Sequence, residues 1–175
     1  MRAFVFPGQG AQTIGMGREL AEAYPAARAV FDEVDEALGE SLSALIWEGD
    51  AGTLTLTQNA QPALMATSIA AFRAMEAEGL SIANADFVAG HSLGEYSALC
   101  AAGSLTLADT AHLLRLRGQA MQRAVPVGQG AMASLIGPKT DVALAEAAAA
   151  AGSEVGVCVV AVHTTLDVMS REPSV

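Results

Sequence analysis

Basic residues are scarce in this sequence: nine lysines and arginines stand against nineteen aspartates and glutamates, which gives a formal net charge of −10 at pH 7. Nucleic acids and anionic membranes select basic surfaces, so the composition argues against either as a partner. Cysteine is scarce too. Cys100 and Cys158 lack the spacing of a metal or redox motif, which predicts two buried, reduced thiols and no bound metal.

The sequence also lacks a long apolar run. Its first residues, MRAFVFPGQG, carry one arginine and an apolar segment too short for a secretion signal, and longer apolar stretches are interrupted by Arg73 or Glu146. We therefore expect a cytoplasmic protein without a membrane span. Hydrophobic residues make up 52% of the 175, which suffices for the core of one domain, or of one domain and part of another.

Short strands alternate with helices in the predicted organisation, which favours an α/β fold. Proline and glycine end several of these segments, and Pro7-Gly8 ends the first strand, so that this strand delivers the glycine-rich loop PGQGAQ. The expected elements are a strand over 2–6, helical segments within 18–38 that break near Tyr24-Pro25, a short helix that ends at Gly49, a strand-like segment or connector over 53–57, a helix over 58–78, a strand over 86–90, and helices over 93–102 and 106–123.

The helix predicted over 58–78 has an apolar face, and Gly79 is a natural end for it. Such a face predicts that the helix packs in the core. The residues that form it are Leu64, Met65, Ile69, Phe72 and Met75.

A serine lies between two glycines where the strand over 86–90 gives way to the next helix, in the stretch AGHSLGEYS. Gly-x-Ser-x-Gly at such a joint is the pattern of a nucleophile elbow, in which small flanking residues permit a sharp reversal that exposes the serine oxygen. The intermediate of such a nucleophile needs hydrogen-bond donors for its oxyanion. The pattern therefore nominates Ser92 as a nucleophile, with the Leu93 N–H as one donor and the PGQG loop, through Gln9, as the second.

Five stretches in this order and spacing carry a resemblance: FPGQGAQ, QPAL, GHSLGEYSAL, RLRGQAMQ and GAMASLIG. Together they resemble the malonyl-CoA:acyl carrier protein transacylases of fatty acid synthesis, acyltransferases that pass a malonyl group between two thiols. The resemblance runs from residue 4 to about residue 161 and covers roughly the N-terminal half of a family member.

The resemblance implies a role for several residues. Ser92 would be the nucleophile, Gln9 and the Leu93 N–H would lie at the oxyanion hole, and Arg117 would bind the free carboxylate of the malonyl group. No cofactor is implied, because the coenzyme A thioester is a substrate, and the implied partners are malonyl-CoA and an acyl carrier protein. Three further residues are implied at the substrate site, although a glutamine near a helix start and a core methionine need no function: Gln61, Met121 and His91.

The assignment of Arg117 also has a physical argument. Residues two apart on a helix, such as Arg115 and Arg117, point to well-separated faces, so only one of the two can easily face solvent. A guanidinium that points inward needs an anionic partner and matches a carboxylate with its planar fork. A malonyl or substituted malonyl group supplies this carboxylate, whereas acetyl does not. The alternative is a structural ion pair with an acid such as Glu95.

The histidines depart from the family pattern. A serine acyltransferase needs a histidine base, but His91 is adjacent to the nucleophile and should leave the turn in another direction, His112 is expected to be solvated, and His163 begins an aperiodic segment. In the family the catalytic histidine comes from a segment after the small subdomain, to which nothing here corresponds. We therefore expect the general base to be absent from this chain.

Three parts are expected from the resemblance. Residues 1–126 would be an incomplete α/β-hydrolase-like large subdomain, 127–162 the first β-α-β of a ferredoxin-like small subdomain, and 163–175 a tail unlike the family. We interpret the departure near Ala161 or Val162 as a frameshift, an early stop or a fusion scar, with a divergent half-length protein as the alternative. Strand edges left uncovered would promote self-association.

The sequence thus favours malonyl transfer to an acyl carrier protein through a seryl ester, in a chain whose activity the absent histidine puts in question. A serine esterase with the same turn, and an inert fragment that acts only as an interaction module, are the alternatives. Because carrier proteins of this family are acidic, any basic docking surface must be local, formed by residues such as Arg115, Arg123 or Lys139, or lie elsewhere.

Overall fold

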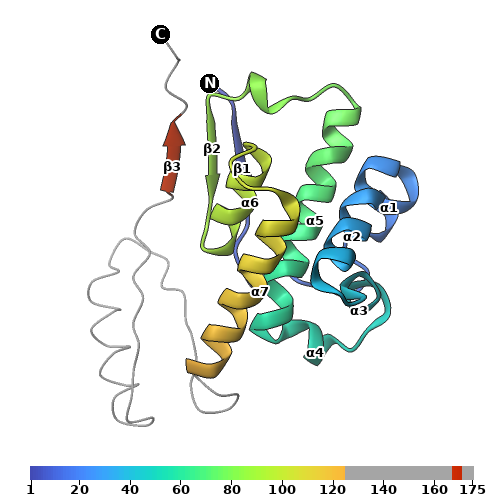
Figure 1. The fold of residues 1–175 in the computed structure, drawn as a ribbon. Coiled ribbons are helices and arrows are strands. Elements are labelled where there is room, and N and C mark those ends of the chain that lie inside the picture. Colours follow the sequence, from blue (N-terminus) through green and yellow to red (C-terminus); the bar gives the residue numbers. More distant parts are fainter. Residues whose placement is uncertain (125–166, 171–175) are drawn as a thin grey trace.

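The computed structural model describes residues 1–124 and 167–170 (Figure 1), so the small subdomain predicted over 127–162 lies outside the described residues. The fold is mixed α/β, as the sequence pattern predicts, and most of its elements among the described residues are helices. The elements in chain order are β1 (Ala3–Phe6), α1 (Arg18–Ala23), α2 (Pro25–Leu38), α3 (Leu42–Glu48), α4 (Ala51–Thr55), α5 (Thr57–Ala77), the 3₁₀ helix η1 (Ile82–Asn84), β2 (Phe87–Gly90), α6 (Leu93–Ala101), α7 (Leu107–Ala124) and β3 (Asp167–Ser170).

The two strands expected from the sequence lie side by side. β1 runs parallel to β2, with Ala3 opposite Phe87 and Phe6 opposite Gly90, and β3 pairs antiparallel with β2, which gives the order β1-β2-β3. Parallel strands end at the same edge of a sheet, where open α/β proteins place their ligand sites. The glycine-rich loop after β1 and the turn after β2 are therefore neighbours.

Helix α5 is central, and in Figure 1 it lies between the strands β1 and β2 and the helices α1 and α2. Leu64, Met65, Ile69 and Phe72 are buried in the core, as its apolar face predicts. The prediction is wrong for Met75, which is 37% exposed because it lies in the last turn, next to the exposed residues that leave the helix. Within residues 1–124, no helix is both long and apolar enough to cross a membrane.

Local signals decide where the helices begin and end. The predicted break between α1 and α2 is confirmed, and Pro25 occupies the first turn of α2, where a missing N–H costs nothing. The segment 53–57 is helical, which corrects the expectation of a strand-like segment or connector. The Asp50 carboxylate accepts hydrogen bonds from the Thr53 N–H at 2.7 Å and its hydroxyl at 3.0 Å, and this cap outweighs the β-propensity of so short a run.

Strand β3 lies in the segment for which the sequence pattern predicts no element. The free edge of a strand offers N–H and C=O groups that pair with any extended backbone, so this pairing needs no side-chain pattern and leaves none to detect. β3 covers one edge of β2, whereas β1 has a single neighbour among the described strands. Self-association through uncovered edges stays a prediction.

Cys100 is 4% exposed in the core and carries a free thiol, which confirms the prediction for this cysteine. Burial raises the pKa of the thiol, and a hydrogen bond with Thr110 opposes that rise. Cys158 lies outside the described residues.

Candidate active site

The loop after β1 lies directly against the turn after β2. The backbone N–H of His91 donates to the carbonyl of Phe6 at 3.2 Å. A Cβ atom at Gly8 would lie 2.4 Å from Nδ1 of His91, so only a glycine lets the loop approach the turn this closely. The two predicted segments of the site therefore form one surface at the edge of the sheet.

Ser92 has the backbone conformation of a strained turn. Its φ of 56° and ψ of −113° make it the one non-glycine residue with a positive φ among residues 1–124 and 167–170. A Cβ at Gly90 would lie 2.0 Å from the carbonyl of Gly94, and one at Gly94 would lie 2.3 Å from the carbonyl oxygen of Phe6. Both glycines are thus required by the close approach of backbone to backbone, and a strained serine costs about 1–3 kcal/mol, which functional sites often retain.

Helix α6 begins immediately after this serine. Leu93 is its first residue, with a side chain that is 1% exposed. The first amides of a helix have no intrahelical acceptor, so the helix itself does not use the Leu93 N–H, and its role as an oxyanion donor stays a prediction.

Gln9 comes from the other loop and is exposed. Its side-chain Nε2 donates to Oγ1 of Thr57, at the start of α5, at 3.3 Å. The structure thus anchors the glycine-rich loop to α5 through Gln9 and brings this side chain to Thr57 rather than to the serine.

Arg117 reaches the serine from α7. Its Nη2 donates to Oγ of Ser92 at 3.0 Å and its Nη1 to Oε1 of Gln61 at 2.7 Å, while the guanidinium carbon lies 5.9 Å from the ring centroid of Tyr96. Gln61 is fully buried, and its Nε2 donates to Sδ of Met121 at 3.2 Å. One chain of contacts thus links four residues that the resemblance implies at the site: Ser92, Arg117, Gln61 and Met121.

The partners of Arg117 are neutral. Among the ion pairs of the described residues none involves Arg117, so the alternative of a structural pair with Glu95 is not realised there. A partly buried guanidinium whose partners are hydroxyl, amide and ring retains the capacity to bind an anion. The arrangement therefore provides a cation next to a strained serine.

The three histidines are placed differently. The imidazole of His91 lies against Gly8, and His112 is exposed on α7, as expected. His163 lies outside the described residues. Among residues 1–124 and 167–170, the side chain that donates a hydrogen bond to the Ser92 oxygen is that of Arg117.

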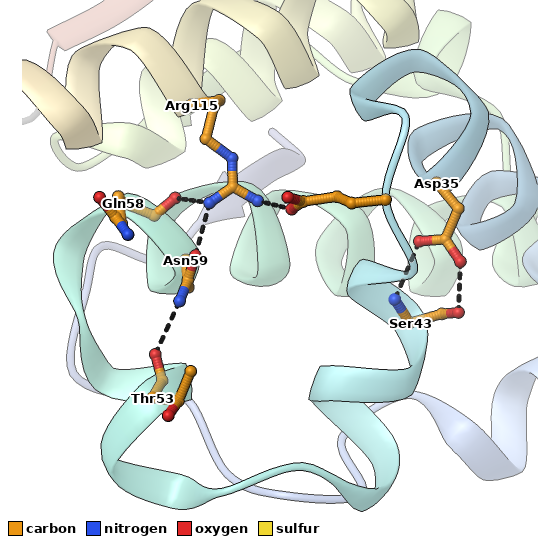
Figure 2. Close-up of polar contacts among 7 residues, drawn as sticks. Asp35, Ser43, Thr53, Gln58, Asn59 and Arg115 are labelled. Carbon is orange, nitrogen blue, oxygen red and sulfur yellow. Dashed lines mark hydrogen bonds and ion pairs between the residues drawn. The ribbon is translucent and has the colours of Figure 1, made fainter.

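Arg115, named above as a candidate for docking, is engaged in the fold. Its guanidinium binds Glu40, the carbonyl of Gln58 and the side chain of Asn59, and the Arg115 side chain is 14% exposed (Figure 2). Burial lowers the pKa of this guanidinium. The structure therefore corrects the candidacy of Arg115 for docking. Arg115 and Arg117 are both partly buried, while Arg123 at the end of α7 is exposed.

Sequence reasoning missed two members of the site. Tyr96 follows Ser92 by four residues, and this helical spacing could have placed its ring on the same face of α6. Thr57 offered no local signal, because its partner Gln9 is 48 residues away in the chain.

Comparison with known proteins identifies the family of this chain. Residues 3–169 match the family described as "Acyl transferase domain". The chain belongs to this family. The match begins one residue before the sequence resemblance and extends to residue 169, into the segment interpreted above as a tail unlike the family.

The names of relatives of this chain specify the acyl group. The chain is 58% identical over 135 residues to the malonyl CoA-acyl carrier protein transacylase of Bacillus subtilis (strain 168), a stretch that covers 77% of this chain and 42% of that protein. The crystal structure of acyl-carrier-protein-S-malonyltransferase from Bartonella henselae matches with a TM-score of 0.79 and 59% identity over 88% of this chain and 49% of that one.

A second similar structure contains a partner. It is a type II PKS acyl-carrier protein in complex with its malonyl-transacylase, and it matches with a TM-score of 0.73 and 42% identity over 83% of this chain and 48% of that one. The chain thus spans about half the length of the relatives it matches.

Proposed function

We propose that this chain carries the acyl-binding half of a malonyl transfer site, which moves a malonyl group from coenzyme A to the pantetheine thiol of an acyl carrier protein. The observation that carries the proposal is the hydrogen bond from Arg117 to Oγ of Ser92, because it sets a carboxylate-binding group beside a strained serine at the end of a parallel strand. The names of the relatives support malonyl as the acyl group.

Ser92 is the proposed nucleophile, and its turn is the proposed nucleophile elbow. Its Oγ attacks the thioester carbonyl, the C–S bond breaks, and the coenzyme A thiol leaves with the proton that Oγ gives up. The pantetheine thiol then attacks the seryl ester, the C–O bond breaks, and the proton returns to Ser92. Each half-reaction passes through an oxyanion, for which the Leu93 N–H and the loop of Gln9 are the proposed donors.

Arg117 is the proposed ligand of the malonyl carboxylate. A guanidinium has five N–H donors, and its two neutral acceptors here leave others for a bidentate pair. Gln61 binds Arg117, Met121 binds Gln61, and His91 lies against the glycine-rich loop, so these three are proposed to shape the acyl pocket. No resident cofactor is needed, because both thiols belong to substrates.

No residue of this site has been assigned as the general base that accepts the proton of the Ser92 hydroxyl. Because the sequence offers no histidine at a position expected for the general base, we propose that the chain by itself loads slowly. The loss of a triad histidine lowers kcat by as much as about 10⁶-fold, which still leaves a rate above that in water. The relatives' names favour acyl transfer over a serine esterase or an inert interaction module.

The test is intact-mass spectrometry of the purified chain after incubation with malonyl-CoA, with Ser92→Ala as the control and acetyl-CoA as the competing donor. We expect a single malonyl adduct on the wild type, none on Ser92→Ala, and much slower loading from acetyl-CoA. Equal loading from both donors would favour the esterase, and no adduct under conditions that load a full-length relative would reject the proposed function for this chain.

A further inference from the structure

The Arg115 guanidinium binds three acceptors within the fold. Its Nη1 donates to the carbonyl oxygen of Gln58 at 2.7 Å and to Oδ1 of Asn59, and its Nη2 pairs with the carboxylate of Glu40 in the loop between α2 and α3 (Figure 2). A planar guanidinium that binds three acceptors at once is fixed in orientation as well as in position.

These acceptors lie at the start of α5. Gln58 and Asn59 belong to its first turn, just before Gln61, which binds Arg117. Asn59 is 8% exposed, and its Nδ2 donates to the carbonyl of Thr53 in α4 at 2.9 Å. The Arg115 side chain thus ties α7 to the segment of α5 that supports the site.

Gly118 is an independent observation at the same junction. A Cβ atom there would lie 2.6 Å from Cα of Gln58 and 2.7 Å from the carbonyl oxygen of Thr57, both of which are backbone atoms. Residues three apart lie on one face of a helix, so Arg115 and Gly118 meet the first turn of α5 together. Gly118 packs against the backbone of α5, and Arg115 binds three acceptors, two of them in α5. Together these contacts restrict sliding of α7 along α5.

Arg117 lies between these two residues in sequence and leaves α7 on another face, towards Gln61 and Ser92. We propose that Arg115 is a positioning residue: together with Gly118 it fixes the register of α7 on α5 and so holds the Arg117 guanidinium against Gln61 and Ser92. The expected effect on malonyl loading rests on the proposed function, whereas the placement of Arg117 does not.

The functional consequence follows from geometry. A bidentate guanidinium–carboxylate pair tolerates little displacement, and a misplacement of about 1 Å can cost on the order of 100-fold in rate. The register of α7 on α5, which Arg115 fixes, therefore controls the selectivity for acyl groups that carry a carboxylate. It does not control the general reactivity of Ser92.

The experiment compares malonyl-CoA and acetyl-CoA as donors for Arg115→Lys and Arg115→Met, with loading rates read from intact mass. Arg115→Met is expected to lower the malonyl-over-acetyl preference by on the order of 10- to 100-fold and to leave acetyl loading unchanged. Arg115→Lys keeps the charge but loses the fork, so its loss is smaller. Equal losses with both donors, or an unchanged preference, would overturn the proposal.

Arg28→Met is the matched control. Arg28 also pairs with a carboxylate, that of Asp32, and packs on the Trp47 ring, but it lies on α2 and contacts neither α5 nor α7 through these bonds. This variant is expected to lose some stability and to keep the wild-type preference for malonyl, which separates positioning from general destabilisation.

A second readout does not need acyl transfer. The Nε–H resonance of Arg117, assigned by its disappearance in Arg117→Lys, should shift in Arg115→Met and in Gly118→Ala but not in Arg28→Met. If the wild type loads no malonyl group, the proposed function fails and this shift alone decides the placement. An unmoved resonance would overturn the inference, and Arg115→Lys supplies both readouts if Arg115→Met does not fold.

Discussion

Two arginines on α7, separated by one residue, have opposite surroundings. Arg115 binds a carboxylate, a side-chain amide and a backbone carbonyl, whereas Arg117 binds a serine hydroxyl and a glutamine amide and lies over a tyrosine ring. The first guanidinium has its counter-charge inside the fold. The second has none among the described residues and therefore retains an electrostatic demand that a ligand can meet.

The contrast teaches that burial alone does not identify a binding arginine. Both side chains are partly buried on the same helix, and their sequence neighbours are similar. What separates them is the charge of their partners, because a guanidinium already paired with Glu40 gains less from a second carboxylate than one held by neutral groups. The comparison can be tested from both sides.

The largest effect is expected for Arg117→Met. Loss of the carboxylate ligand should slow malonyl loading of Ser92 by on the order of 100-fold, about 2.7 kcal/mol of barrier, while acetyl loading stays the same. Intact-mass time courses with the two thioesters measure both rates. A variant that loses both rates in parallel would contradict the assignment of Arg117.

For the free energy of unfolding we expect the opposite order, with a larger loss in Arg115→Met than in Arg117→Met. Arg115→Met is expected to lower the free energy of unfolding by about 2–3 kcal/mol, because Asn59 and the Gln58 carbonyl lose a charged donor in a partly buried place. Arg117→Met should cost about 1 kcal/mol, chiefly through the buried Gln61 amide. Urea denaturation measures both, and equal costs would break the contrast.

The charge of Glu40 should matter less than the arginine it binds. Its side chain is 48% exposed, so solvent screens the pair, and Glu40→Gln keeps an oxygen acceptor. We expect a loss of about 0.5 kcal/mol that shrinks as salt is added. A loss as large as that of Arg115→Met at high salt would show that the carboxylate, not the array of acceptors, dominates this network.

The smallest expected effect is a pH dependence of the free energy of unfolding that arises from Asp50, which is linked to Arg115 through Thr53 and Asn59. Hydrogen bonds from the Thr53 N–H and hydroxyl lower the pKa of Asp50, and the Thr53 carbonyl accepts from Asn59. A lowered folded-state pKa means that the stabilisation is present above the unfolded value of about 3.9 and is lost as pH falls through the folded one.

Asp50→Asn tests this effect, because asparagine caps a helix without titrating. The variant should match the wild type near neutral pH and lose less stability below about pH 4. Thermal unfolding between neutral and acidic pH measures the difference, and parallel curves would show that the Asp50 cap does not contribute.

Local signals explain most of what the sequence could predict. Short-range sequence features predict the position of the serine, its loop and the edge of the sheet. These features are the strand ends at Pro7-Gly8 and Gly90 and the glycines that flank Ser92. Arg117 was identified by resemblance and by helical spacing, and the structure brings it to the serine.

The remainder depends on contacts between distant residues. Arg115 binds Glu40 and Asn59, which are 75 and 56 residues away, so no spacing rule could reveal its role. The segment 53–57 has the composition of a strand, but a single cap at Asp50 makes it helical. β3 pairs through backbone groups that leave no trace in the side-chain pattern.

The parallel pairing of β1 with β2 has a consequence for how the protein acquires its site. The Arg2 N–H donates to the carboxylate of Asp86, 84 residues along the chain, so closing this pair requires the ends of a very long loop to meet. Contacts of such high sequence separation slow folding, whereas the intervening helices rest on local bonds. We therefore expect the helices to form first and the serine and its glycine-rich loop to come together last, so that a partly folded chain has its scaffold before it has its chemistry.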